Sequence, residues 1–266
     1  LANLKGVIWG KIMSLLIWIG LFTTLISCVF VLKNILIDLK INEKLAIVSN
    51  CTTDEDTSIS GSSSEVGGIC GNSYGAAIIR CVNNADVTGS SNVGGIAGHH
   101  REYYKTHVNS YIIECISSEK ATITAKATNG IAGGLLGYST SDRSGHPLAI
   151  SYVVGSYSLS EVSANTAGSL IGHTHTDNCH IIASWAKKVA DNVIGAGSHT
   201  NISTDHFAST SDINQDFVTQ MNTTIEEYNE NVKDEEGSAV ADIIKCHYKW
   251  QYNAGSWPTL VEVVEP

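Results

Sequence analysis

A short pattern of apolar residues and glycines returns several times along the middle of the chain. Its first copy, from Val66 to Gly71, reads Val-Gly-Gly-Ile-Cys-Gly. Further copies begin at Val93, Ala132 and Ala167, and a shortened fifth copy lies near Val193. Self-similarity at a spacing of roughly 20 to 50 residues is the signature of a protein built from stacked repeats.

A second apolar block follows each of the first four motifs. The blocks begin at Ala77, Tyr111, Ala149 and His180, and they are rich in β-branched and bulky residues. Asn, Ser, Gly or Asp residues bound each block, which is the composition of short β-strands between turns. Each repeat is therefore predicted to carry about two strands, separated by a loop of variable length.

The strands are expected to stack from one repeat to the next, because a pair of short strands cannot bury its apolar face alone. Repeats stacked about 4.8 Å apart would share one core, with equivalent residues in columns. The two predicted columns are Ile78, Ile112, Ile150 and Ile181, and Ile69, Ile96, Leu135 and Leu170. The predicted fold is an all-β repeat solenoid, similar to a β-helix, over residues 58–210. Residues 99–110 and 138–148 are predicted to be loops on one side of the stack.

The motif glycines are expected to be structural. Successive glycines permit a positive φ angle and a close approach of neighbouring backbones at a corner. Apolar residues at motif positions one, four and five break a period of two, so a bend or bulge is expected at the glycine pair. The motif glycines are Gly67, Gly68, Gly71, Gly94, Gly95, Gly98, Gly133, Gly134, Gly137, Gly168 and Gly172.

The last part of the chain, residues 211–266, follows a different pattern. Apolar residues at helical spacing predict a helix over Gln215–Asn231, with Asp212 as its cap. Two short stretches, Lys245–Trp250 and Thr259–Val264, predict a pair of strands. Since the end of a stacked sheet exposes unpaired strand edges, this small α+β segment is predicted to cap one end of the repeats.

An apolar stretch without charged residues runs from Ile12 to Leu32. It is long enough to span a bilayer, and Leu25–Cys28 within it resembles a bacterial lipobox. Cys28 is a candidate lipidation site, with a signal peptide cut elsewhere and a retained membrane anchor as alternatives. Residues 1–38 are interpreted as this export or anchor segment, and residues 39–57 as a solvated tether. Each alternative predicts export to the cell surface or outer membrane, with membrane contact through the N-terminus.

Composition narrows the classes of partner. Charged residues make up only 16% of the chain, and the net charge is −10 at pH 7. Nucleic-acid-binding proteins need a basic stripe that neutralises phosphates, so no nucleic-acid partner is expected. No sequence feature implies a cofactor.

Cysteine and histidine residues could add a disulfide or a metal site. Cys81 and Cys115 fall in one predicted column, where neighbouring strands are close enough for a disulfide. Two small buried thiols are the favoured interpretation, because the other repeats carry no cysteine in that column. His173 and His175 would share one face of a strand, but no Asp, Glu or Cys completes a ligand shell, so no metal site is predicted.

The repeat motif resembles a known family. The Val-Gly-Gly-Ile-x-Gly core, followed by an Ile-x-x-Cys-Val block, is similar to the GLUG repeat over residues 58 to about 198. GLUG repeats occur in bacterial surface proteins, notably of gut Bacteroides relatives, and beside the catalytic domain of immunoglobulin A-cleaving metallopeptidases. The resemblance implies a secreted or surface protein, and it says nothing of the ligand.

The residues that catalysis would need are not evident. The chain has no His-Glu-x-x-His string to hold zinc and a general base, so it is not predicted to be a metallopeptidase. The acids of the repeats form no convincing pair of the kind that glycoside hydrolysis requires. The chain is therefore expected not to be an enzyme.

The expected function is binding. Tyr103, Tyr104 and Trp185 offer aromatic faces that suit sugars and protein partners, and they are weak candidates for a binding site. The sequence thus predicts a non-catalytic, adhesin-like surface protein that binds a glycan or a host protein. The alternatives are a carbohydrate-active enzyme and a structural envelope spacer. Acids converging in a groove would favour the enzyme, and a ridge of aromatic side chains would favour binding.

Overall fold

The computed structural model describes residues 45–62, 64–101, 108–140, 150–175, 179–236 and 238–263. These residues belong to one compact unit, Leu45–Pro266. The candidate lipidation site Cys28 and the apolar stretch Ile12–Leu32 lie outside the described residues. In the part of the chain that is described, no helix is long and apolar enough to cross a membrane.

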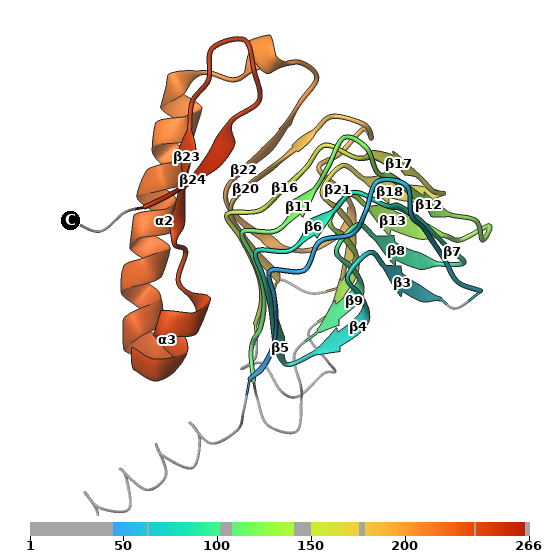
Figure 1. The fold of residues 1–266 in the computed structure, drawn as a ribbon, viewed down its shortest axis with the longest axis horizontal. Coiled ribbons are helices and arrows are strands. Elements are labelled where there is room, and N and C mark those ends of the chain that lie inside the picture. Colours follow the sequence, from blue (N-terminus) through green and yellow to red (C-terminus); the bar gives the residue numbers. More distant parts are fainter. Residues whose placement is uncertain are drawn as a thin grey trace, which may run out of the picture. The chain divides into compact units, whose positions relative to one another are not determined.

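Most of the described chain forms parallel β-sheets (Figure 1). The nine-stranded sheet contains β1 (Ala46–Ser49), β5 (Ala76–Ile79), β10 (Ser110–Ile113), β15 (Ser151–Val154), β20 (Cys179–Lys187), β16 (Tyr157–Ser158), β11 (Ile116–Ser117), β6 (Val82–Asn83) and β22 (Thr200–Phe207). A four-stranded sheet contains β17 (Glu161–Ser163), β12 (Thr122–Ala125), β7 (Asp86–Gly89) and β2 (Ser58–Ser60). Another contains β18 (Thr166–Gly168), β13 (Ile131–Gly133), β8 (Asn92–Gly94) and β3 (Glu65–Gly67). The five-stranded sheet contains β21 (Ile194–Gly197), β19 (Ile171–Thr174), β14 (Leu136–Thr140), β9 (Ala97–Arg101) and β4 (Cys70–Tyr74).

Within the repeats, strands pair in parallel with the equivalent strands of the neighbouring repeat. We number the repeats 1 (45–74), 2 (76–101), 3 (110–140), 4 (151–174) and 5 (179–197). Strands β5, β10 and β15 are buried at every position, which explains why the last three residues of each are apolar rather than alternating with polar ones. The mostly β character expected from the sequence is confirmed.

The column that begins at Ile69 is confirmed by its backbone hydrogen bonds. The amide of Ile69 donates to Ile96, that of Ile96 to Leu135, and that of Leu135 to Leu170, at 2.8 to 3.0 Å. The amide of Leu170 donates in turn to Val193 at 2.9 Å, so the shortened fifth motif continues the column.

The other predicted column was wrong in repeat 4. Ile78 pairs with Ile112, and Ile112 pairs with Val153 rather than with Ile150. Val153 then pairs with Ile181, so the fourth block is shifted by three residues from the predicted alignment. The prediction aligned the isoleucines of successive blocks. The register is instead determined by the corner that follows each strand.

This corner is a left-handed residue at the same place in every repeat. Asn50, Arg80, Glu114, Gly155 and Ala183 have φ angles of 55°, 52°, 54°, 55° and 47°. Four of the five carry a side chain, and a left-handed conformation costs such residues about 1 kcal/mol each. The surrounding hydrogen bonds hold them there, and this fixed bend aligns the strands on either side of it.

The predicted tether, residues 39–57, is partly incorrect. Strand β1 lies within it and pairs with β5 from Ala46 to Ser49, so the stacked part of the chain begins before residue 58.

The motif glycines are required for space and not for a positive φ angle, which none of them has. A Cβ atom on Gly94 would lie 2.6 Å from the amide nitrogen of Gly137 in the next repeat. A Cβ atom on Gly137 would lie 2.6 Å from the amide nitrogen of Val93 in the preceding one. Real Cβ atoms do not come so close to backbone, so the repeats could not stack at their present separation with larger residues.

The second glycine of each pair makes room for a polar side chain of the next repeat. Cβ atoms on Gly95 and Gly134 would collide with the side chains of Ser117 and Ser158. In the fourth motif Ser169 replaces this glycine, and Ala186 pairs with Ser158 in the polar column. The larger Ser169 in the motif is thus accompanied by the smaller Ala186 in the polar column.

The C-terminal segment packs on the face of the nine-stranded sheet. It contains α2 (Gln215–Glu236), α3 (Ser238–Ile244) and the antiparallel pair β23 (Tyr248–Gln251) and β24 (Thr259–Glu262). The helix and strand pair were predicted, but the segment covers the face of the sheet, not the strand edges at its end (Figure 1). The buried contact includes Tyr111, Ile113, Tyr152 and Val154 from the strands and Val218, Met221, Ile225, Tyr228 and Val232 from α2.

Helix α2 is capped by Asn214, because the Asn214 side chain accepts a hydrogen bond from the Phe217 amide at 2.9 Å. The predicted cap, Asp212, instead lies in a short 3₁₀ turn, Thr210–Asp212. Its side chain accepts a hydrogen bond from the amide of Ser209, the residue before that turn, at 2.8 Å.

Polar contacts attach the C-terminal segment to the left-handed corners. The buried Glu114 carboxylate accepts hydrogen bonds from the amides of His247 and Tyr248, at 2.5 and 2.7 Å. The Trp250 indole donates to the Ala183 carbonyl at 3.0 Å. Burial raises the pKa of Glu114, while these amides and Arg80 favour the ionised carboxylate. Three polar links therefore join two repeats to the segment that covers them.

Gly94→Ala is expected to lower the free energy of unfolding by at least about 3 kcal/mol, because the added methyl group meets the backbone of the next repeat. Urea unfolding followed by circular dichroism measures this. The matched control is Gly255→Ala: nothing lies within 4 Å of its Cβ, and only its φ of 75° is strained, so a loss of about 1 kcal/mol is expected. Equal losses in both variants would show that packing between repeats is not the reason for the motif glycine.

Candidate ligand-binding surfaces

The five-stranded sheet carries a row of rings on its outer face. Register places Asn72, His99, Tyr138, His173 and Ala196 at equivalent positions of successive strands. The ring of Tyr138 lies 5.0 Å from the rings of both His99 and His173, edge-on to the first and stacked on the second. We call His99, Tyr138 and His173 the ring ridge. Tyr138 and His173 are partly exposed, so part of each ring is accessible from solvent.

A carboxylate lies at the first end of the ring ridge. Glu65 Oε1 lies 3.0 Å from Nδ1 of His99, and its other oxygen accepts a hydrogen bond from the Asn72 side chain. This carboxylate fixes the orientation of the first ring and adds an acceptor beside the ridge.

A second outward row lies two residues further along the same strands. Tyr74, Arg101 and Thr140 are in register, and the Arg101 guanidinium lies 3.7 Å from the centre of the Tyr74 ring. Such cation–π stacking holds a long side chain in place. Tyr74 is 41% exposed, which is rare for a large apolar residue among those described. The two rows together present rings, a cation and a carboxylate on one surface.

The alternate residues of these strands point inward and are buried. Ser73, His100, Ser139 and Thr174 form this inner row, and His100 Nδ1 lies 3.2 Å from the Ser73 hydroxyl. Burial lowers the pKa of His100 to about 3, although a backbone hydrogen bond at Ser110 partly opposes the shift. His100 is therefore neutral at physiological pH and contributes to the core.

Trp185 does not offer a free aromatic face, contrary to the prediction. It is fully buried in β20, stacked on Tyr157 at 5.1 Å and on Trp257 at 5.4 Å, with Trp250 against its edge. The other two predicted aromatic residues, Tyr103 and Tyr104, lie outside the described residues.

We searched the described histidines for a metal site. Within the described part of the chain, no group of three or more His, Cys, Asp or Glu side chains could hold a metal ion. His173 lies in the ring ridge and His175 follows the strand; burial and the nearby His175 lower the pKa of His173.

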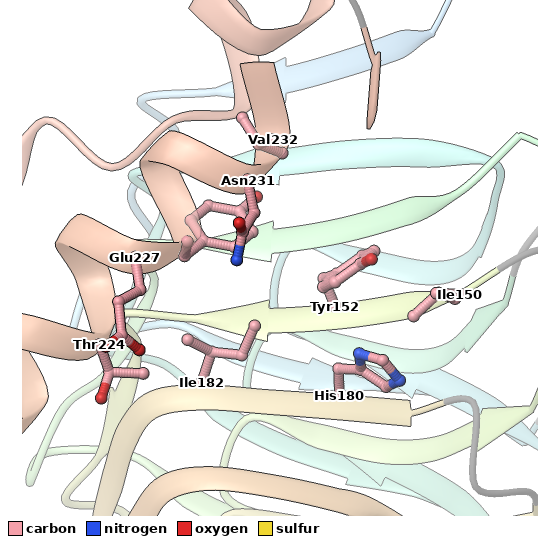
Figure 2. A pocket seen from close by; sticks show the side chains of 9 residues that line it. Ile150, Tyr152, His180, Ile182, Thr224, Glu227, Asn231 and Val232 are labelled. Carbon is pink, nitrogen blue, oxygen red and sulfur yellow. The ribbon is translucent and has the colours of Figure 1, made fainter. Parts of the chain in front are cut away.

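A second candidate surface lies between α2 and the nine-stranded sheet. A cavity of about 190 Å³ is present there. Figure 2 shows Glu227 and Asn231 on α2 across the cavity from Tyr152 and His180 on the strands. The remaining lining residues are Ile150, Ile182, Thr224, Tyr228 and Val232. Pockets for drug-sized ligands are usually larger, about 300 to 1,000 Å³, so this cavity suits only a small group.

The sequence contained a signal for the ring ridge that the repeat pattern concealed. Residues 99–110 and 138–148 were predicted to be loops, whereas β9 extends to Arg101 and β14 to Thr140. Alternation of inward and outward residues continues through His99 to Arg101 and Tyr138 to Thr140. This alternation with a period of two, over the three residues that follow each motif, identifies the extra strand positions.

Comparison with known proteins gives one structural similarity. No known family profile matches the chain, and no curated protein does. Among solved structures, the chain is similar to a “putative immunoglobulin A1 protease” from Bacteroides ovatus, at 17% identity and a TM-score of 0.42. The match covers 82% of this chain and 60% of that one, so the chain spans less than two thirds of its neighbour.

This comparison corrects one prediction. The chain was expected not to be an enzyme, and the structure to which it is similar is named as a protease. The expectation is therefore not upheld. At this identity and TM-score, the similarity does not assign the neighbour's activity to this chain.

Unfolding of the protein is expected to depend on pH through His100. An unfolded histidine titrates near 6.5 and the folded one at about 3, so the unfolded state binds more protons between these values. The free energy of unfolding should therefore fall as pH decreases from 6.5 towards 3, by up to about 1.4 kcal/mol per pH unit from this group.

Urea unfolding of the wild type and His100→Asn at pH 7, 5 and 4 tests this. Asparagine keeps a polar atom near Ser73 and cannot titrate, so the variant should show a shallower slope. The same slope in His100→Asn and the wild type would contradict the assignment.

Proposed function

We propose that this chain is an exported repeat protein of the cell surface that binds a glycan along the ring ridge. In this proposal the stacked repeats form a β-solenoid of the GLUG type, which holds side chains at a fixed spacing along one face. The in-register parallel sheets and the sequence resemblance support the solenoid. An adhesin-like role follows if the glycan belongs to another cell.

The ring ridge is the observation that carries the proposal. Sugars bind by stacking on aromatic faces while nearby polar groups fix their hydroxyls. Tyr138 and His173 supply partly exposed rings at a spacing of 5.0 Å. Glu65 contacts His99 at the first end of the ridge, and Arg101 lies in the neighbouring outward row. A ridge of rings is the arrangement that the sequence analysis associated with binding.

Export is supported by the sequence. The apolar stretch Ile12–Leu32 is long enough for a signal or anchor segment, and Cys28 ends a lipobox-like string. We propose that this segment attaches the chain to the outer or cytoplasmic membrane and leaves the repeats outside the cell.

Tyr138→Ala is expected to weaken glycan binding about tenfold, which corresponds to the loss of roughly 1.4 kcal/mol of stacking. Glycan-array screening of the purified full chain in detergent identifies a ligand, and calorimetry compares the variants. The substitution should fold, because Ala196 occupies the same row in repeat 5.

Glu227→Gln is the matched control, since it alters the cavity beside α2 and leaves the ridge intact. Its affinity should equal that of the wild type. Loss of binding in Glu227→Gln with full binding in Tyr138→Ala would show that the glycan binds in the cavity and not on the ring ridge. Binding that survives enzymatic removal of glycans would instead identify a protein ligand, and the absence of any ligand would leave a structural spacer.

Protease treatment of intact cells is expected to cleave the repeats, because the proposal places them outside. Wild-type chain should remain with membranes on fractionation, and Cys28→Ala should be released if Cys28 carries the lipid. Repeats that resist protease on intact cells, but not on lysed ones, would show that the surface location is wrong.

A further inference from the structure

Three cysteines occupy one column of the nine-stranded sheet, directly after the left-handed corner. The amide of Val82 donates to the carbonyl of Cys51 at 2.8 Å, and that of Ile116 donates to Cys81 at 2.9 Å. The amide of Tyr157 donates to Cys115 at 3.0 Å. These bonds place Cys51, Cys81 and Cys115 at equivalent positions of repeats 1, 2 and 3. Repeats 4 and 5 have serine there, at positions 156 and 184.

The thiols of this column are in mutual contact. The thiols of Cys51 and Cys115 both lie close enough to the Cys81 thiol to change its pKa. Equivalent residues on neighbouring parallel strands lie about 4.8 Å apart, within the range of roughly 4.4 to 6.8 Å that a disulfide spans between Cα atoms. All three are free thiols in this structure.

Access from solvent differs along the column. Cys51 is exposed, whereas Cys81 and Cys115 are fully buried. A reagent in solution can therefore reach only the first thiol, and any change at the second must pass through it.

The column also favours one thiolate. Hydrogen bonds from Cys115 and Cys51 lower the pKa of Cys81, whereas burial raises the pKa of Cys115. The charge on Cys81 raises the pKa of Cys51. Since the thiolate is the form that attacks a disulfide, Cys81 is the stronger internal nucleophile.

We propose that Cys51 and Cys81 are an oxidation site, at which a small-molecule disulfide such as glutathione disulfide converts the two thiols into one disulfide. The Cys51 thiolate attacks a sulfur of the reagent, forms a mixed disulfide and releases one glutathione thiolate. The Cys81 thiolate then attacks the Cys51 sulfur and releases the second. The two cysteines lose two electrons, the reagent gains them, and the two protons go to the two glutathione thiolates.

The disulfide would fasten the first strand of the stack. Strand β1 is largely exposed and, among the described strands, pairs only with β5, so backbone pairing and few side chains hold it in place. A covalent bond between repeats 1 and 2 would keep this strand attached. This inference does not depend on the glycan proposal, although an exported chain would meet the oxidising conditions it requires.

The full chain, treated with defined mixtures of oxidised and reduced glutathione, tests the proposal. Mass spectrometry of tryptic peptides without reduction should show peptide 45–80 joined to peptide 81–101, with the loss of two hydrogens. Because peptide 45–80 contains both Cys51 and Cys70, fragment ions must place the bond at Cys51. Hydrogen exchange of the amides of residues 46–53 should slow in the oxidised chain.

Serine variants separate the two steps, and serine fits this column because Ser156 and Ser184 already occupy it. Cys81→Ser should stop at the mixed disulfide, with one glutathione on Cys51. Cys51→Ser should form no bond between the two peptides, and Cys115→Ser should form it as the wild type does. A bond at Cys70, a bond between Cys81 and Cys115, or a wild-type chain that retains glutathione on Cys51 would overturn the proposal.

Discussion

The parallel, in-register hydrogen bonding between successive repeats is the constraint on which the rest of this structure depends. Every backbone group of one repeat must meet its counterpart about 4.8 Å away, so each position along the chain has a neighbour of equivalent geometry. Apolar residues then fall on apolar residues, as from Ile69 to Val193, and polar residues fall on polar ones, as in the row from Ser73 to Thr174. The ring ridge and the cysteine column arise in the same way, because rings and thiols at equivalent positions of successive repeats lie side by side.

The motif glycines show how narrowly this spacing is set. They are needed because the adjacent repeat leaves no volume for a methyl group, and their own dihedral angles are ordinary. Where the fourth motif departs from glycine, at Ser169, the facing column changes to Ala186. The larger residue in the motif is thus accompanied by a smaller residue in the facing column. Variation between repeats is thus tolerated when it is paired, which explains how copies can diverge and still stack.

The sequence predicted the repeats, the strand-rich fold, the C-terminal helix and the column at Ile69, because these depend on local composition and a regular motif. It misplaced Ile150, since residue identity cannot show which residue takes the left-handed corner, here Gly155. Trp185 was predicted to be accessible, because its burial by the distant C-terminal segment leaves no pattern in the neighbouring sequence. The prediction missed Tyr138 for a different reason: the strand continues past the motif, and only an alternation of three residues marks it.

The contacts of the C-terminal segment have a consequence for how the protein unfolds. A stack of repeats that touch only their neighbours can lose its terminal units one by one. Here Glu114 of repeat 3 and Ala183 of repeat 5 are both bound to the same short stretch, His247 to Trp250. Repeats 3 to 5 are thereby coupled and should open together, whereas among the described residues of repeat 1 only Leu45 packs against the apolar cluster of this segment. The molecule therefore combines a cooperative block with a first repeat that is held less firmly, and the exposed Cys51 lies in that first repeat.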